Sequence, residues 1–249
     1  MRFIGIIPAR YASTRFPGKP LADMKGKPMI QRVYEQVHDV LDAVCVATDD
    51  RRIMSAVKAF GGNVVMTSAM HKSGTDRCYE AYTKVGRGYH VIVNIQGDEP
   101  FIGADQIETL KSCFSDIYVQ IATLVRPLRA GDRFEAALLF NHNSPKAVLN
   151  KNNEAIYFSR SVIPYFRGKV HTEWLSNHTY YKHIGLYAYR ADVLREITLL
   201  PQSPLEIAEG LEQLRWLENG YRIKAGITHQ DTVGIDTPED LEHALTLLK

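Results

Sequence analysis

Short apolar segments alternate with amphipathic segments along most of this 249-residue chain. The apolar segments have the length and composition of buried strands, whereas the amphipathic ones repeat their apolar residues with the period of a helix. This alternation predicts βα units arranged around a mostly parallel sheet. The expected fold class is therefore α/β, with a mixed, mostly parallel sheet flanked by helices.

The expected elements follow from these periods and from the breakers between them. Segment 90–95 is apolar enough to be buried on both faces, which is typical of a central strand. The expected strands are residues 3–7, 44–47, 64–66, 90–95, 119–126, 185–189 and 221–227. The expected helices are residues 29–40, 51–60, 74–85, 105–114, 191–199, 204–219 and 238–248.

The middle of the chain changes character. Residues 146–150 and 155–158 flank a polar turn and predict a hairpin. Residues 159–182 are rich in aromatic and polar side chains and predict a lobe or a long loop over the site. We expect one domain spanning 1–249, with a small lobe near 146–189.

Composition excludes several classes of protein. The 30 Lys and Arg residues against 28 Asp and Glu residues give a formal net charge of +2, too small to indicate binding to nucleic acid or to a membrane surface. No apolar run approaches the roughly 18 residues that a membrane helix needs, and the N-terminal run is too short for a signal peptide. We expect a soluble cytoplasmic protein without stable membrane association, and any attraction for an anionic ligand must be local.

The three cysteines are Cys45, Cys78 and Cys113, with no C-x-x-C pair. An odd number without paired spacing argues against a disulfide framework and against a cysteine zinc site. We expect three small, half-buried, apolar side chains, which suits a reducing compartment.

The loop at residues 8–20 begins with a proline and carries three cations, Arg10, Arg15 and Lys19. They lie among small residues, together with one glycine and two more prolines. Fixed backbone N–H groups together with guanidinium and ammonium groups are what a triphosphate requires. The loop follows a buried strand, where open α/β sheets bind ligands. It is not a P-loop, because G-x-x-x-x-G-K-[ST] is absent. The alternative is a solvated basic loop.

Two aspartates each follow an expected strand. Asp98 lies directly after segment 90–95 behind Gly97, and Asp236 precedes the last expected helix. Mg²⁺ prefers carboxylate oxygens and substrate phosphates, with one or two carboxylates from the protein. Two aspartates at strand ends therefore predict a shared magnesium site. The alternatives are a turn residue for Asp98 and a helix start for Asp236.

Three further segments carry weaker signals. Residues 71–77 open an expected helix whose free N–H groups and hydroxyls suit a base or a phosphate, although ordinary helix starts look similar. Arg160 after the hairpin and His183 before a strand are ordinarily structural; together they would suit a carboxylate and sugar hydroxyls. The acidic and amide side chains of residues 204–219 predict a solvated face with one side chain turned inward; they are Glu206, Glu209, Glu212 and Gln213.

The chain resembles the 3-deoxy-manno-octulosonate cytidylyltransferase family over nearly its whole length. The opening signature comprises Ile7-Pro8-Ala9-Arg10 through Gly18-Lys19-Pro20-Leu21 and continues in Gly26-Lys27-Pro28-Met29-Ile30. Five later blocks match in order: residues 71–77, 94–100, 183–187, 211–215 and 234–241. Phe16 replaces the leucine expected there, which is a conservative change. Residues 166–182 are the least similar.

The resemblance implies a nucleotide-diphospho-sugar transferase fold, a homodimer and a role in lipopolysaccharide biosynthesis. It implies the reaction of CTP with the acid sugar Kdo to give CMP-Kdo and pyrophosphate, assisted by Mg²⁺ on Asp98 and Asp236. It assigns the triphosphate to Arg10, Arg15 and Lys19. The remaining nucleotide-binding residues that it implies are Pro8, Ala9, Ser73, Gly74 and Gln96. The sugar-binding residues that it implies are Arg160, His183, Tyr187, Glu212 and Gln213, with Arg160 on the sugar carboxylate.

Two alternatives to this function stay open from the sequence. The phosphate loop contacts only the nucleotide, so a cytidylyltransferase for another acid sugar, such as an amino-Kdo analogue or a sialic acid, would carry the same loop. A CTP-binding regulatory protein without turnover is the alternative from another class, although the presence of both Asp98 and Asp236 argues against it.

Overall fold

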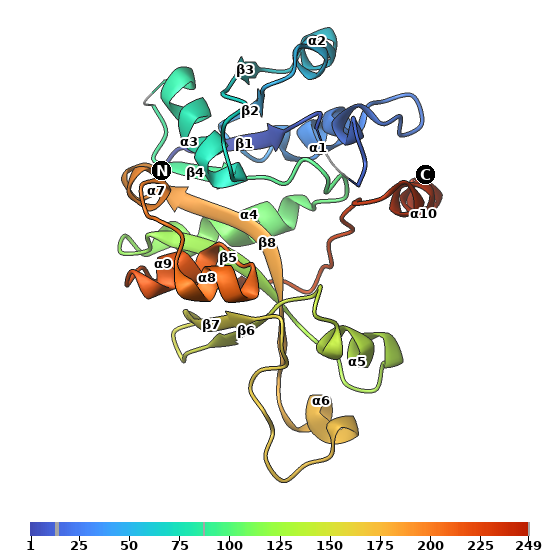
Figure 1. The fold of residues 1–249 in the computed structure, drawn as a ribbon, viewed down its shortest axis with the longest axis vertical. Helices are drawn as coiled ribbons and strands as arrows, with labels where there is room; N and C mark the ends of the chain where they lie inside the picture. The colour runs from blue at the N-terminus through green and yellow to red at the C-terminus, as the bar shows by residue number, and fades with distance from the viewer. Residues whose placement is uncertain (13–14, 87, 249) are drawn as a thin grey trace. The chain divides into compact units, whose positions relative to one another are not determined.

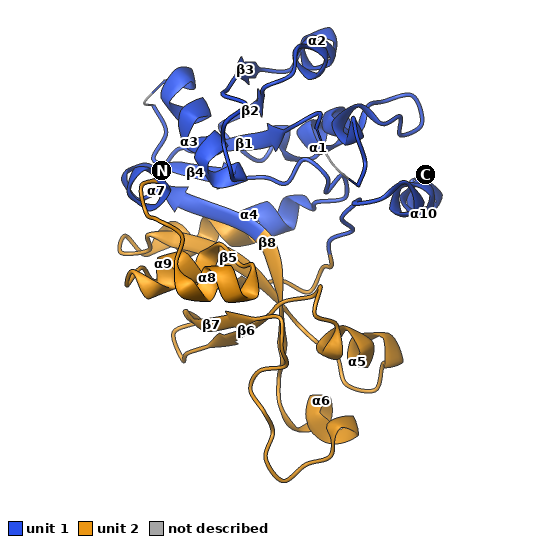
Figure 2. Cartoon of the chain, in the orientation of Figure 1, with its two compact units in different colours: residues 1–108, 186–198, 232–249 blue, residues 109–185, 199–231 orange. Residues whose placement is uncertain are grey.

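The structure is a computed structural model that describes residues 1–12, 15–86 and 88–248. Residues 13 and 14 of the predicted phosphate loop lie outside the described residues. The chain forms two compact units, coloured separately in Figure 2. Unit 1 contains residues 1–108, 186–198 and 232–249, and unit 2 contains residues 109–185 and 199–231.

Unit 1 is built on a parallel sheet that continues into one antiparallel strand. Its strand order is β3-β2-β1-β4, followed by the second half of β8, which runs antiparallel to β4. Because β4 lies between β1 and β8, the predicted central strand is confirmed. The strands are β1 (Phe3–Ala9), β2 (Ala43–Thr48), β3 (Val64–Met66), β4 (Val91–Asn94) and β8 (Tyr181–Arg190).

Helices α1, α2, α3 and α7 of unit 1 pack on this sheet, whereas α10 packs against Met24, Met29 and Ile235 (Figure 1). Helix α3 contacts β1, β4 and α7, whereas α1 and α2 contact β2. The helices are η1 (Lys19–Leu21), α1 (Met29–His38), α2 (Arg51–Ala59), α3 (Gly74–Val85), α7 (Ala191–Thr198) and α10 (Pro238–Leu247), and α4 (Ala104–Ser112) begins in this unit. Among the described residues, no helix is long and apolar enough to cross a membrane.

Unit 2 holds a smaller set of strands. Strand β5 pairs in parallel with β9, and the hairpin β6–β7 pairs with the first half of β8 through β6. The strands are β5 (Ile121–Pro127), β6 (Lys146–Leu149), β7 (Ala155–Ser159) and β9 (Ile223–Ile227). The helices are η2 (Cys113–Ser115), α5 (Arg133–Phe140), η3 (His171–Glu173), α6 (Trp174–Asn177), α8 (Pro204–Glu209) and α9 (Gln213–Glu218).

The α/β fold class is confirmed, and so are the hairpin and the helix at residues 74–85. The helix predicted at residues 204–219 is wrong, because Gly210 adopts a left-handed conformation with φ of 60° and ends α8. Glycine reaches that conformation without steric cost, so the chain turns there and a second helix starts at Gln213. Helix α5 was not predicted, since its weakly patterned sequence, Arg133–Phe140, resembles a loop flank.

All three cysteines are free and pack as small apolar groups, but they are buried rather than half-buried as predicted. Burial disfavours the thiolate and raises the pKa of Cys45 and of Cys113 to about 11. Cys45 and Cys113 therefore have no reactive thiolate near neutral pH.

Candidate active site

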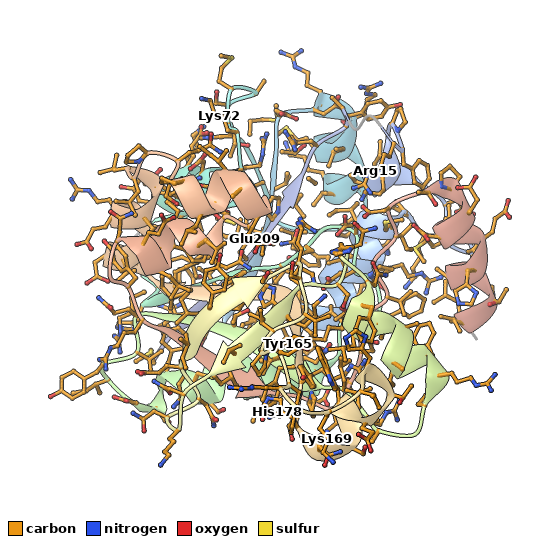
Figure 3. The ribbon with its side chains drawn as sticks, turned by 60° about the horizontal axis from the view of Figure 1, so that its bottom comes forward. Arg15, Lys72, Tyr165, Lys169, His178 and Glu209 are labelled. Carbon is orange, nitrogen blue, oxygen red and sulfur yellow. The ribbon has the colours of Figure 1, made fainter. Side chains whose placement is uncertain are left out.

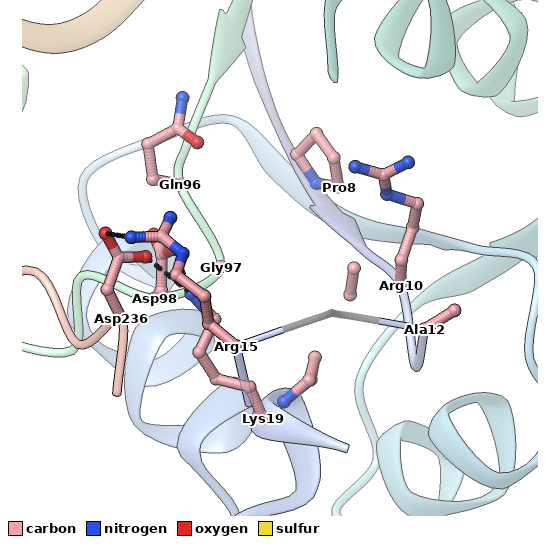
Figure 4. Close-up of a pocket in the computed structure, with 11 residues that line it drawn as sticks. Pro8, Arg10, Ala12, Arg15, Lys19, Gln96, Gly97, Asp98 and Asp236 are labelled. Carbon is pink, nitrogen blue, oxygen red and sulfur yellow. Dashed lines mark hydrogen bonds and ion pairs between the residues drawn. The ribbon is translucent and has the colours of Figure 1, made fainter. Parts of the chain in front are cut away.

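A polar cavity of about 450 Å³ opens in unit 1 where β1 and β4 end (Figure 4). It brings together every residue that the sequence assigned to the triphosphate or to magnesium, although they are up to 226 positions apart in the chain. The lining residues are Pro8, Ala9, Arg10, Ala12, Arg15, Lys19, Pro20, Gln96, Gly97, Asp98 and Asp236.

The loop after β1 is folded back on itself by its own residues. Gly18 has φ of 72°, and its backbone N–H donates to the carbonyl of Tyr11 over 2.9 Å. The Tyr11 ring covers Gly18 on one side and lies 3.2 Å from the guanidinium carbon of Arg52, measured to the ring centroid. This packing places Lys19 at the start of η1, facing the cavity. No sequence pattern indicated the contribution of Arg52, which comes from α2.

Asp98 reaches the cavity because the chain after β4 passes very close to β1. A Cβ atom on Gly97 would lie 2.9 Å from the carbonyl oxygen of Pro8, which is too close for any side chain. Glycine is therefore required at this position by a backbone contact. That contact holds Asp98 beside the phosphate loop.

We expect Gly97→Ala to lower turnover by at least about tenfold while leaving a folded protein, because the added methyl group must push Asp98 away from the loop. Pyrophosphate release at saturating substrate measures the effect. Gly61→Ala is not a suitable control because Gly61 has φ of 80°, whereas Gly234→Ala is suitable, since nothing lies within 4 Å of the added Cβ. Normal turnover by Gly97→Ala would show that Asp98 does not depend on this contact.

Asp236 is held by the start of α10. The backbone N–H groups of Asp236 and Thr237 donate to the Asp240 carboxylate over 3.0 and 2.9 Å, and the Thr237 hydroxyl accepts from the Asp240 N–H. This reciprocal capping fixes the chain just before the helix. The neighbouring Ile235 N–H donates to the backbone carbonyl of Asp98 over 2.9 Å. The two aspartates are thereby tied together through the backbone.

Lys19 lies between the two carboxylates. Its ammonium is 2.5 Å from Asp98 Oδ2 and 3.2 Å from Asp236 Oδ1, and Arg15 pairs with the other oxygen of Asp236 at 3.0 Å (Figure 4). Each of the two carboxylates thus contacts at least one cation of the phosphate loop. The position between the two aspartates is one that favours positive charge.

This donor set fits a hard divalent cation. The described residues contain no cluster of three or more His, Cys, Asp or Glu side chains able to hold a metal. Mg²⁺ does not need one, because it usually takes one or two carboxylates and completes its shell with substrate phosphates and water. Asp98 and Asp236, with the Lys19 ammonium standing where a cation is stabilised, are the chemistry expected of such a site.

The other residues assigned to the nucleotide lie at two places in unit 1. Gln96 lines the cavity. Ser73 is the N-cap of α3 and accepts from the N–H of Asp76, while a Cβ on Gly74 would lie 3.6 Å from Pro8. Asn94 is a buried neighbour of Gly74 that sequence reasoning did not single out, and its amide oxygen is buried with no hydrogen-bond partner among the described residues.

Four of the residues assigned to the sugar belong to unit 2, and Tyr187 belongs to unit 1. Arg160 follows β7, and its guanidinium donates to three backbone carbonyls, those of Glu209, Gly210 and His142. Tyr187 is buried in β8, where its ring stacks on Tyr189.

His183 is buried in unit 2. Its Nε2 lies 3.0 Å from the Thr123 hydroxyl, and its ring packs edge-on against Phe158. Burial lowers the pKa of His183 to about 3, so the imidazole is neutral at physiological pH. Any role in sugar binding is therefore that of a neutral hydrogen-bonding group.

The prediction of a solvated face on residues 204–219 is wrong for two side chains. Glu206 is 6% exposed and Gln213 is 5% exposed. Glu206 forms a two-point ion pair with Arg215, at 2.7 and 2.5 Å, which holds α8 against α9. The break at Gly210 changes the helical phase, so residues that share a face in one helix do not share it in two.

Comparisons with known proteins agree with the geometry. The sequence profile of the family described as cytidylyltransferase matches residues 4–247. A 3-deoxy-manno-octulosonate cytidylyltransferase of Parabacteroides distasonis is 77% identical, with 100% of this chain and 98% of the relative covered. The enzyme of the same name from Phocaeicola vulgatus is 70% identical, with 100% and 98% covered. A solved CMP:2-keto-3-deoxy-manno-octonic acid synthetase in complex with CTP has a TM-score of 0.90 and 43% identity, over 99% of this chain and 98% of its own.

Proposed function

The chain belongs to the 3-deoxy-manno-octulosonate cytidylyltransferases within the cytidylyltransferase family, and from this premise we propose that it joins CMP to Kdo. The reaction consumes CTP and Kdo and yields CMP-Kdo and pyrophosphate. We propose that it serves lipopolysaccharide biosynthesis in the cytoplasm. The observation that carries this proposal is the cavity in which Arg10, Arg15 and Lys19 meet Asp98 and Asp236.

The proposed reaction needs no covalent intermediate on the protein. The anomeric hydroxyl oxygen of the sugar attacks the α-phosphorus, the bond from that phosphorus to the bridging oxygen of pyrophosphate breaks, and the hydroxyl proton is released. Both reactants are anionic, so the catalyst must offset charge and align the reacting atoms. Arg10, Arg15 and Lys19 are placed to bind the triphosphate and to stabilise the charge that grows on pyrophosphate as it leaves.

Asp98 and Asp236 would hold Mg²⁺, which supplies charge stabilisation at the α-phosphate when it is bound. Their carboxylates are presented by rigid parts of unit 1, the Gly97 contact for Asp98 and the α10 cap for Asp236. Lys19 contacts both carboxylates, so a metal held by Asp98 and Asp236 would replace this contact and leave the ammonium to bind the phosphates.

Arg160 is proposed to bind the carboxylate of the acid sugar. A guanidinium has five N–H donors, and the three hydrogen bonds to carbonyls leave two for a ligand. None of these acceptors is charged, so the positive charge of Arg160 is not offset by an ion pair among the described residues. His183, Glu212, Gln213 and Tyr187 are proposed to contact the sugar hydroxyls.

The direct test is pyrophosphate release from purified protein with CTP, Kdo and Mg²⁺, and with each omitted in turn. Release that requires all three supports the proposal. Release with a sialic acid or an amino-Kdo analogue but not with Kdo would retain the nucleotide chemistry and replace the sugar. Tight CTP binding without turnover on any acid sugar would overturn the proposal in favour of a regulatory protein.

We also propose a homodimer that forms through the aromatic part of unit 2. Phe140 and Tyr165 are exposed large apolar side chains whose rings pack around Trp174, at centroid distances of 6.1 and 5.2 Å. Beside them lies a hollow of about 210 Å³ lined by α5 and by residues 171–176. Figure 3 labels Tyr165 in this segment. The family resemblance implies a homodimer, and we propose that a second copy of the chain covers this exposed apolar surface.

Phe140→Glu is expected to convert the dimer to a monomer, because it places a charge in the centre of this apolar surface. Light scattering after size exclusion measures the mass of wild type and variant side by side. Phe134→Glu is the matched control, since Phe134 is exposed on the same helix and outside the hollow. A wild type that is monomeric at micromolar concentration would contradict the proposed dimer.

A further inference from the structure

Lys146, the first residue of β6, is completely buried, with 0% of its surface exposed. Its ammonium donates to three backbone carbonyls, those of Ser144, Arg160 and Asn141, over 2.8, 2.9 and 3.0 Å. An ammonium has three N–H donors, so all of them are used. Nothing in the proposed chemistry uses this lysine directly.

Burying a cation costs free energy unless it is well solvated by the protein. Three backbone carbonyls solvate the ammonium directly, and the nearby Glu209 carboxylate adds electrostatic stabilisation without an ion-pair contact among the described residues. Burial lowers the pKa of Lys146 to about 8, which keeps most of the ammonium protonated at neutral pH. A buried methionine would avoid the cost of the charge, but it would leave three carbonyls without donors. The lysine therefore satisfies three buried carbonyls that an apolar side chain would leave without donors.

The three carbonyls come from two segments that both contact Arg160. One carbonyl belongs to Arg160 itself. The other two belong to Asn141 and Ser144, at the ends of a short loop in which the carbonyl of His142 accepts from Arg160 Nη1 over 3.1 Å. Lys146 thus fixes both the backbone of Arg160 and the loop on which its guanidinium rests.

Glu209 completes the frame around Arg160. Its carboxylate accepts from the Arg160 N–H over 2.9 Å and from the Ser159 hydroxyl over 2.6 Å, and its carbonyl accepts from Arg160 Nε over 2.6 Å. Figure 3 labels Glu209. Glu209 holds one side of the arginine, and the Lys146-bound loop holds the other.

We infer that Lys146 is a positioning residue for Arg160, holding its backbone and its supporting loop so that the guanidinium presents a fixed site to the carboxylate of the acid sugar. The inference rests on the proposed function, because it takes Arg160 as the carboxylate-binding group. Lys146 itself has no proposed contact with the substrate. It acts only through Arg160.

The test measures KM for Kdo and KM for CTP separately. Lys146→Met is expected to raise KM for Kdo by about 10-fold to 100-fold, as a binding group displaced by about 1 Å does, and to leave KM for CTP unchanged. The Arg160→Met variant is expected to lose Kdo binding as well. In a double-mutant cycle, Lys146→Met in the Arg160→Met background is expected to add little, since both changes remove the same interaction.

Two further variants keep the result interpretable. Lys146→Gln retains two N–H donors, so it is expected to fold if Lys146→Met does not and to raise KM for Kdo by a smaller factor. Ile223→Ala, a buried core change in β9 of the same unit, controls for general destabilisation. It is expected to lower the melting temperature without changing the ratio of the two KM values.

Hydrogen exchange tests the positioning independently of turnover. The amides of Ser144 and Arg160 are hydrogen-bonded in the structure and are expected to exchange faster in Lys146→Gln, whereas those of β9 are expected to be unchanged. Unchanged exchange together with an unchanged KM for Kdo in a folded variant would overturn the inference. If the wild type is inactive on Kdo but Lys146→Gln still shows this faster exchange, the proposed function is overturned, whereas the positioning of Arg160 by Lys146 is not.

Discussion

Asp98→Asn is expected to lower turnover at least about 100-fold while the protein stays folded, by analogy with the loss of one preorganised electrostatic group. The amide has nearly the shape of the carboxylate but carries no charge, so it is a poor ligand for a hard divalent cation. It also leaves Lys19 paired with Asp236 alone. Pyrophosphate release at saturating CTP and Kdo, measured across a Mg²⁺ titration, gives the effect.

Asp39→Asn is the matched control for this variant. Asp39 is an aspartate of the same unit whose side chain is 93% exposed and pairs with His38 at the surface. It is expected to keep normal turnover. Near-normal turnover by Asp98→Asn at saturating Mg²⁺ would remove Asp98 from the metal site and leave the phosphate-binding assignment of the loop intact.

The parts of the fold that sequence predicted are those set by local pattern. The helix over Gly74–Val85 and the strands around β4 are each fixed by their own apolar periodicity, which needs no knowledge of distant residues. The break at Gly210 was missed because a glycine within an amphipathic pattern is compatible with either a continuous helix or a cap. Only packing decides, and here the Glu206–Arg215 ion pair joins two separate helices.

The residues of the candidate site likewise fall into those that a local pattern predicts and those that only tertiary contacts reveal. Arg10, Arg15, Lys19 and Asp98 stand out because charged residues follow strands, and strand ends of a parallel sheet share one edge. The contact of Lys19 with both aspartates joins residues 217 positions apart and has no local signature. The same holds for Lys146, which reads in the sequence as an ordinary lysine at the start of a hairpin. Its burial follows from the carbonyls that tertiary folding gathers around it.

Lys19→Met is expected to lower kcat/KM for CTP at least about 100-fold and, unlike a merely structural change, to strengthen metal binding in the absence of nucleotide. The side chain of Lys19 is largely buried between Asp98 and Asp236. Removing its charge leaves two carboxylates that had shared one ammonium, and such a pair of like charges favours a cation between them. We expect the wild-type ammonium to compete with a metal for those same carboxylates until a triphosphate offers it another partner.

A gain in metal affinity distinguishes competition between Lys19 and the metal from the simple loss of a phosphate contact. Titration with Mn²⁺, followed by paramagnetic resonance of the free ion, is expected to show nucleotide-free Lys19→Met binding at least about tenfold more tightly than wild type, or about 1.4 kcal/mol. Lys27→Met is the control, because Lys27 pairs with Glu35 at the surface of the same unit, outside the cavity. Adding Asp98→Asn to Lys19→Met is expected to abolish the gain. Equal Mn²⁺ affinity in Lys19→Met and wild type would mean that the lysine does not stand in the cation position, and that its role is confined to the phosphates.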